Sequence, residues 1–195
     1  MIGCRPLNHD EKKRLNIAIK DKKRDRLLIM LGLATGFRIS ELLSLRIKDL
    51  VAPNKKPLDF VSVQAKNAKS KKGRSQQMND QVQTAIKEWC GNLLKKGADQ
   101  DSFVFVGRES KKFKKALTRQ RAWQILKDIF AIAGIYGQTG THTLRKTFAK
   151  GLKDSGFAIE VIQKALGHIS ITSTIHYLSF DQERLNNHIR NMELF

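Results

Sequence analysis

The most informative part of the chain lies at residues 141–178, which read THTLRKTFAKGLKDSGFAIEVIQKALGHISITSTIHYL. Its apolar residues recur at helical spacing, and Gly167 follows an apolar run in the way that glycine commonly ends a helix. We therefore expect helices at residues 141–153, 158–166 and 172–178. This part of the chain predicts a domain whose C-terminal half is helical.

The same stretch contains four residues whose chemistry suits a phosphate site. His142 and Arg145 are three positions apart, so a helix projects both from one face. The first turn of a helix also favours an anion, because its N–H groups are unpaired. His168 follows the predicted helix end, and Tyr177 follows nine residues later. Taken alone, a helical His beside an exposed Arg arises often by chance, so an ordinary structural reading stays open.

The remaining helices are predicted from caps and periodicity. Asn8 and Glu11 have the spacing of a capping box, which predicts a helix running to about residue 20. Residues 24–35 are mostly apolar and end at Gly36, which is typical of a buried central helix. Further helices are expected at residues 39–45, 79–97, 118–134 and 182–192. In the helix at 118–134 the apolar side consists of Ala122, Ile125, Ile129 and Ile132.

One small sheet is predicted between these helices. Residues 60–65 read FVSVQA, an alternation of apolar and polar residues that indicates a strand. Residues 74–78 can return antiparallel to it, and residues 103–106 form either a further strand or an extended connector. The predicted fold class is mainly α with a small antiparallel β-sheet (α+β), in a single domain at residues 1–195.

The charge of the chain points to a polyanionic partner. It holds 37 Lys and Arg residues against 18 Asp and Glu residues, a formal charge of +19. Basic residues gather at 54–74 and 108–121, and although one such run is usually a solvated loop, two runs with a global excess favour a phosphate-facing surface. The predicted DNA contacts are Lys69, Lys71, Lys72, Arg74, Lys111, Lys112, Lys114 and Lys115.

Other features of the sequence indicate the cellular compartment in which the protein is expected to act. Cys4 and Cys90 have no paired spacing, so neither a disulfide framework nor a metal site is predicted. The N-terminus lacks an apolar signal core, and the apolar stretch at residues 27–34 is too short to cross a bilayer. We expect a cytoplasmic protein that acts on DNA without a cofactor or a membrane.

Four motifs in order resemble the catalytic domain of the tyrosine recombinase (phage integrase) family. They are TGFRISEL at 35–42, QAKN at 64–67, HTLR at 142–145 and LGH at 166–168, followed by Tyr177. Together they cover residues 7–190 or so, which is far more specific than any one motif. The resemblance implies a catalytic set of Arg38, Lys66, His142, Arg145, His168 and Tyr177.

The resemblance also implies a role for each member of the set. Tyr177 attacks the scissile phosphate, and the two arginines bind its oxygens. Lys66 is the general acid, with Lys69 as the alternative, and Glu41 orients the site. His142 assists proton transfer at the tyrosine, and His168 hydrogen-bonds the phosphate.

The implied activity is site-specific recombination of double-stranded DNA through a 3′-phosphotyrosine, in a tetrameric synapse, by a bacterial or phage-encoded enzyme. Relaxation of DNA by a type IB topoisomerase is one alternative, and a non-catalytic DNA-binding regulatory protein is another. Typical members have an N-terminal core-binding domain, which we expect to be absent from this sequence, either because the sequence is a part of a longer protein or because it belongs with short members such as the fimbrial DNA-inversion recombinases. Residues 179–195 are expected to form a tail helix that packs in cis or on a neighbouring protomer.

Overall fold

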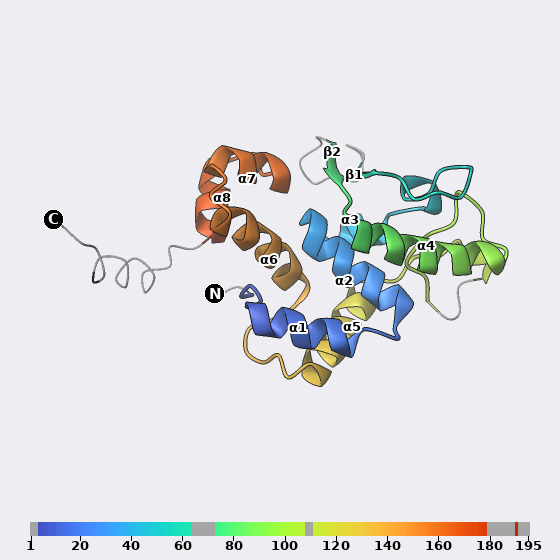
Figure 1. The fold of residues 1–195 in the computed structure, drawn as a ribbon, viewed down its shortest axis with the longest axis horizontal. Helices are drawn as coiled ribbons and strands as arrows, with labels where there is room; N and C mark the ends of the chain where they lie inside the picture. The colour runs from blue at the N-terminus through green and yellow to red at the C-terminus, as the bar shows by residue number, and fades with distance from the viewer. Residues whose placement is uncertain (1–3, 64–72, 108–110, 179–189, 191–195) are drawn as a thin grey trace.

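The computed structural model describes residues 4–63, 73–107, 111–178 and 190, and the described part is mainly helical with one two-stranded sheet (Figure 1). This confirms the predicted fold class. The elements are α1 (His9–Ala18), α2 (Lys23–Thr35), α3 (Ile39–Leu43), η1 (Ile47–Asp49), β1 (Phe60–Val63), β2 (Arg74–Gln77), α4 (Asp80–Lys95), η3 (Lys111–Phe113), α5 (Arg119–Ile132), α6 (Thr141–Asp154), α7 (Ile159–Leu166) and α8 (Ile171–Leu178).

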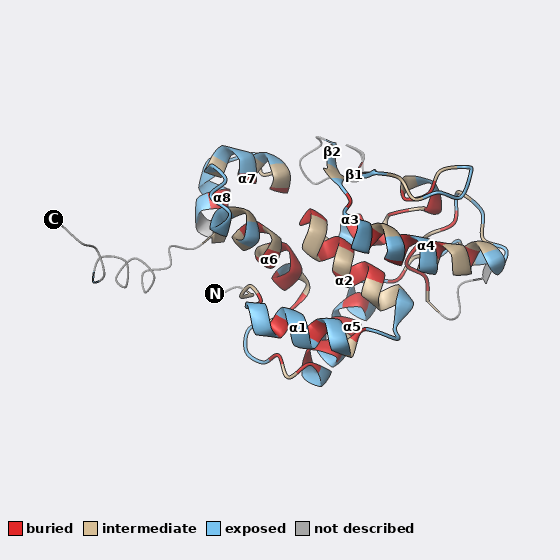
Figure 2. Cartoon of the chain, viewed as in Figure 1, coloured by how far each residue is buried: buried red, intermediate tan, exposed pale blue. Residues whose placement is uncertain are grey.

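Helix α2 is the centre of the main core, as its apolar sequence predicts. It packs against α4 on one side and α6 on the other. Leu27, Leu28, Ile29 and Leu31 are all fully buried, and Figure 2 shows buried residues along this helix. Burial of a leucine or isoleucine side chain contributes about 1.5–3 kcal/mol, so α2 alone contributes a large share of the hydrophobic stabilisation.

The helix ends form where the sequence predicts them. The Asn8 side chain accepts a hydrogen bond from the Glu11 backbone N–H, and the Glu11 carboxylate accepts one from the Asn8 N–H, so the capping box is present. Gly36 and Gly167 follow α2 and α7 with φ of 61° and 64°. This left-handed conformation favours glycine, and it allows the chain to turn sharply at both places.

The hairpin is also confirmed. Strands β1 and β2 pair antiparallel, and Val63 opposite Arg74 is the last described pair. The QAKN motif at 64–67 lies outside the described residues, as do Lys66, Lys69, Lys71 and Lys72. Residues 103–106 form an extended connector with isolated bridges to Arg46 and Ala116.

A second, smaller core joins the C-terminal helices. Ala149 of α6 packs with Ile162 and Leu166 of α7, and Tyr177 of α8 lies against this cluster. The three helices thus form a unit beside the main core (Figure 1). Arg190 is the single described residue of the predicted tail helix at 182–192.

One prediction about the core is wrong. Ile132 was expected on the buried side of α5, but its side chain is 64% exposed, whereas Ala122, Ile125 and Ile129 are buried. Helix α5 ends at Ile132, and the next residue, Ala133, is buried in its place. In the described part of the chain no helix is both long and apolar enough to cross a membrane.

Candidate active site

Arg145 lies at the centre of the predicted site and is almost completely buried, with 1% of its surface exposed. Its guanidinium donates hydrogen bonds to the Gly36 carbonyl at 2.5 Å and to the Leu166 carbonyl at 2.7 Å. These acceptors are the ends of α2 and α7. Burial, and next the charge of Arg38, lower the pKa of Arg145 to about 10, so it remains a cation near neutral pH.

Tyr177 reaches the same place from α8. Its ring centroid lies 5.8 Å from the Arg145 guanidinium carbon and 5.5 Å from the Lys146 ammonium nitrogen. The hydroxyl donates a long hydrogen bond of 3.4 Å to the His142 carbonyl. Burial raises the pKa of Tyr177 to about 12, against the opposing charge of Arg145. The phenol is therefore protonated near neutral pH and must lose its proton before or during any attack.

His168 follows the left-handed Gly167, as the predicted helix end requires. Its ring stands edge to face against the Tyr177 ring, with centroids 5.4 Å apart. Its Nδ1 lies 2.9 Å from the hydroxyl of buried Thr174, which fixes the ring and leaves Nε2 for another partner. Burial and next the charge of Arg145 lower the pKa of His168 to about 4. The imidazole is therefore neutral at physiological pH.

His142 stands on the first turn of α6, where its side chain is solvent-accessible. Desolvation by the neighbouring protein, followed by the charges of Arg145 and Arg38, lowers the pKa of His142. Both histidines of the predicted set are therefore biased toward the neutral form, which can accept a proton.

Arg38 approaches from the other side, at the N-terminal cap of α3. Its backbone N–H donates to the Glu41 carboxylate at 2.5 Å, and its guanidinium donates to the same group at 3.2 Å. The Arg38 side chain is 21% exposed, so it stays accessible to a ligand, whereas the Glu41 side chain is 1% exposed. This contact supports the expectation that Glu41 orients the site, which stays a prediction.

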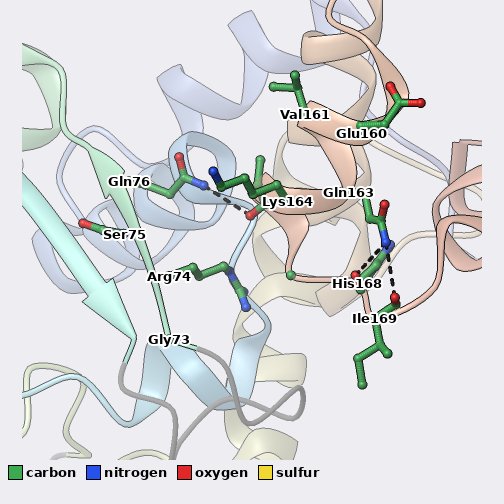
Figure 3. Close-up of a pocket in the computed structure, with 12 residues that line it drawn as sticks. Gly73, Arg74, Ser75, Gln76, Glu160, Val161, Gln163, Lys164, His168 and Ile169 are labelled. Carbon is green, nitrogen blue, oxygen red and sulfur yellow. Dashed lines mark hydrogen bonds between the residues drawn. The ribbon is translucent and has the colours of Figure 1, made fainter.

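Arg74 corrects a prediction. It was expected on the DNA-facing surface, yet its side chain is 7% exposed and its guanidinium donates to Glu41 at 2.5 Å. Figure 3 shows it beside His168 in the pocket between β2 and α7. One signal was available at Glu41, which stands among apolar residues in the run ISELL: if buried, it requires a cationic partner, although this does not say which basic residue supplies it.

Part of the second basic cluster lies away from this site, although the charge of Arg119 contributes to lowering the pKa of His142. Lys114 pairs with Asp99 at 2.8 Å, and the η3 turn hydrogen-bonds through Phe113 to the Phe103 N–H. The first contact is with the segment that follows α4, and the second is with the extended connector at 103–106. The expectation that Lys111, Lys112, Lys114 and Lys115 contact DNA remains a prediction.

The assembled groups suit transfer of a phosphoryl group. Arg38 has an accessible guanidinium, and the fully buried Arg145 is fixed by two carbonyls, so the positive charge is preorganised. A protonated phenol and a neutral imidazole lie beside them. Five of the six predicted catalytic residues are described by the structure, and all five gather here.

Comparisons with known proteins agree with this arrangement. The model of the phage integrase family matches residues 5–184. The tyrosine recombinase XerA of Pyrococcus furiosus is 32% identical over 183 residues, covering 94% of this chain and 59% of the relative. The type 1 fimbriae regulatory protein FimE of Escherichia coli K12 is 30% identical over 162 residues, covering 83% of this chain and 77% of the relative.

Solved structures show the same fold. The XerA recombinase crystal structure has a TM-score of 0.79 at 25% identity, with 100% of this chain and 68% of that chain covered. The XerH recombinase bound to a palindromic difH substrate has a TM-score of 0.75 at 26% identity, with 95% and 52% covered. The chain spans 59% of the length of XerA and of an XerD relative from Oceanobacillus iheyensis.

Proposed function

Because the chain belongs to the phage integrase family, we propose that it cleaves and rejoins DNA at specific sites through a covalent bond to Tyr177. The observation that supports this most is that the Tyr177 ring lies 5.8 Å from the Arg145 guanidinium carbon and 5.4 Å from the His168 ring. A nucleophile, a phosphate-binding cation and an imidazole that can hydrogen-bond the phosphate thus meet in one chain.

The proposed reaction is an in-line exchange at phosphorus. The Tyr177 oxygen loses its proton and bonds to the scissile phosphorus, while the bond from phosphorus to the 5′-oxygen breaks. The 5′-oxygen takes up a proton and leaves as a hydroxyl, and the 3′ end stays on the enzyme as a phosphotyrosine ester. Because one ester replaces another, a 5′-hydroxyl of a second strand can reverse the step.

Each residue of the site has a role in this step. Arg38 and Arg145 bind the non-bridging oxygens, whose charge increases in the transition state, and comparable donors are worth roughly 3–4 kcal/mol each. His142 accepts the tyrosine proton, and His168 hydrogen-bonds the phosphate. Lys66, with Lys69 as the alternative, protonates the leaving 5′-oxygen.

The substrate is double-stranded DNA, and exchange takes place in a tetrameric synapse. The charge of +19 supports a partner of this kind. Contacts to phosphate release counterions, so affinity for a duplex should fall steeply as salt rises.

A nicked duplex tests the proposal. Duplexes that bind the protein are first selected from a random-sequence library, and a nick is then placed so that the short cleaved fragment with the new 5′-hydroxyl diffuses away. We expect a protein–DNA adduct that survives denaturing electrophoresis, lost in Tyr177→Phe and kept in the control Tyr136→Phe. Selected duplexes that bind the wild type tightly yet give no adduct would overturn the proposal in favour of a DNA-binding regulatory protein. Relaxation of supercoiled plasmid without recombinant product would favour the topoisomerase.

A further inference from the structure

A buried ion cluster connects the hairpin to the site. Glu41 lies at its centre and receives both arginines, Arg38 at 3.2 Å and Arg74 at 2.5 Å. Burial is the largest single effect and opposes ionisation of Glu41, but the hydrogen bonds from Arg74 and from the Arg38 backbone, together with the charges of both arginines, outweigh it, so the pKa of Glu41 is lowered. A buried carboxylate needs such partners to stay charged, and Arg74 is the nearer of the two cations.

Arg74 also fits closely against two neighbouring segments. Its guanidinium carbon lies 4.7 Å from the centroid of the Phe37 ring, next to Arg38 in sequence. On the opposite side, a Cβ atom placed on Gly167 would lie only 2.8 Å from an Arg74 nitrogen. The Gly167 turn that precedes His168 is therefore packed directly against the Arg74 side chain.

Strand β2 holds this side chain in place. Arg74 and Gln76 are two residues apart, so they face the same side of the strand, and Gln76 donates to the Ala165 carbonyl at 3.2 Å near the end of α7 (Figure 3). Arg74 is also the first residue of β2, at the end of the strand that follows residues 64–72 in the sequence. Arg74 thus contacts Phe37 and Glu41, which flank Arg38, and lies against Gly167, which precedes His168.

Stability alone does not explain a cation in this position. In the part of the chain that the structure describes, the buried Arg74 Nε has no hydrogen-bond partner, and an unsatisfied buried polar group costs about 1–3 kcal/mol. Apolar residues often replace a buried ion pair without loss of stability. Two nitrogens of the Arg74 guanidinium donate to the Glu41 carboxylate, so the contact that the structure gives this side chain is with the site residue Glu41.

We propose that Arg74 is a positioning residue: it fixes Glu41, and through it Arg38, against the Gly167–His168 turn, without touching the DNA phosphate. This inference rests on the proposed function, since the geometry that it maintains is that of the phosphate site. The chemical requirement is for a planar, forked donor, which a lysine ammonium does not supply.

Four variants test this role: Arg74→Met, Arg74→Lys, Glu41→Gln and the double variant Arg74→Met with Glu41→Gln. Arg46→Met is the matched control, because the Arg46 guanidinium also lies over a ring, 4.4 Å from the centroid of Phe103, but away from the site. The measurements are the single-turnover rate of adduct formation on the nicked duplex, the affinity for intact duplex, and thermal unfolding.

We expect Arg74→Met to lower the rate of adduct formation about 100-fold, because small misplacements of reacting groups produce effects of this size. Its affinity for intact duplex should stay within about twofold of the wild type, a smaller change than the loss of a phosphate contact causes. The rate of adduct formation by Arg74→Lys should lie between those of the wild type and of Arg74→Met. If Arg74 acts through Glu41, the double variant loses less than the product of the single losses. An unchanged rate in Arg74→Met, or a shallower salt dependence of affinity as expected for a lost phosphate contact, would overturn the proposal. If Arg74→Met does not fold, Arg74→Lys and the charge-balanced double variant decide in the same way.

A readout without DNA separates this inference from the proposed function. NMR titration of the Glu41 carboxyl and the His168 imidazole should give a higher pKa for both groups in Arg74→Met than in Arg46→Met, because a neighbouring positive charge is lost. Wild-type protein that forms no adduct would refute the proposed function, and this titration would still decide whether Arg74 organises the cluster. Unchanged titrations in Arg74→Met would refute the positioning role.

Discussion

The guanidinium carbon of Arg145 lies 5.8 Å from the ring centroid of Tyr177, and the two residues come from α6 and α8 of the same chain. The proposed nucleophile and a proposed phosphate-binding residue are therefore supplied by the same chain. A small apolar core of α6, α7 and α8 residues supports this arrangement.

Cleavage in cis is the first prediction. If Tyr177 attacks a phosphate bound by its own Arg145, then a mixture of Tyr177→Phe and Arg145→Ala proteins contains no complete site. We expect the mixture to form adduct at the background level of each variant alone. Adduct restored by mixing would instead show that the tyrosine is donated to a neighbouring protomer.

A second prediction concerns stability at Arg145. Truncation to alanine leaves the Gly36 and Leu166 carbonyls without their donor in a buried position, and each such loss costs about 1–3 kcal/mol. We expect Arg145→Ala to lower the free energy of unfolding by about that amount or more in urea denaturation. Tyr177→Phe removes only a 3.4 Å hydrogen bond and should stay within about 0.5 kcal/mol of the wild type. Equal stabilities of the two variants would contradict this account of Arg145.

Two glycine-to-alanine substitutions should change the stability of the protein in opposite directions. Gly36 has φ of 61°, and a Cβ there would lie 2.3 Å from the Phe148 ring, so Gly36→Ala should destabilise by at least the roughly 1–2 kcal/mol of the left-handed conformation. Gly91 lies within α4, and its Cβ would have nothing within 4 Å, so Gly91→Ala should stabilise by about 1 kcal/mol. If the melting temperatures of the two variants changed in the same direction, this would contradict the requirement for glycine at position 36.

The pH dependence of folding should report the environment of His168. Its pKa is about 4 in the folded protein, below the ordinary 6.5, so the unfolded chain binds more protons between these values. Stability from this group is complete above pH 6.5 and is lost as pH falls toward 4. We expect His168→Gln to lose less unfolding free energy than the wild type between pH 7 and pH 4.5. Parallel losses would mean that His168 is not held neutral.

Much of the site could be predicted from the sequence because its residues sit in local patterns. Gly36 and Gly167 end helices where apolar runs stop, and His142 and Arg145 share a face at helical spacing. The resemblance then brought Arg38 and Tyr177 into one set. This set was inferred from the order of the motifs along the chain. The structure brings its described members together, as the resemblance implied.

Arg74 shows where such reasoning stops. It belongs to a basic run in which no local pattern distinguishes the inward-facing residue from its solvated neighbours. Its burial depends on the hairpin register and on Glu41, which is 33 residues away in sequence. The prediction for Ile132 was wrong for a related reason, because apolar residues at helical spacing do not show at which turn the helix leaves the core.

Peptide mapping of the covalent adduct tests the central claim most directly. The two tyrosines fall in different tryptic peptides, Tyr136 in residues 128–145 and Tyr177 in residues 165–184. After digestion of an adduct with nuclease and trypsin, mass spectrometry should find the nucleotide remnant on Tyr177 alone. A remnant on the 128–145 peptide, or on a residue other than tyrosine, would contradict the assignment of Tyr177 as the nucleophile.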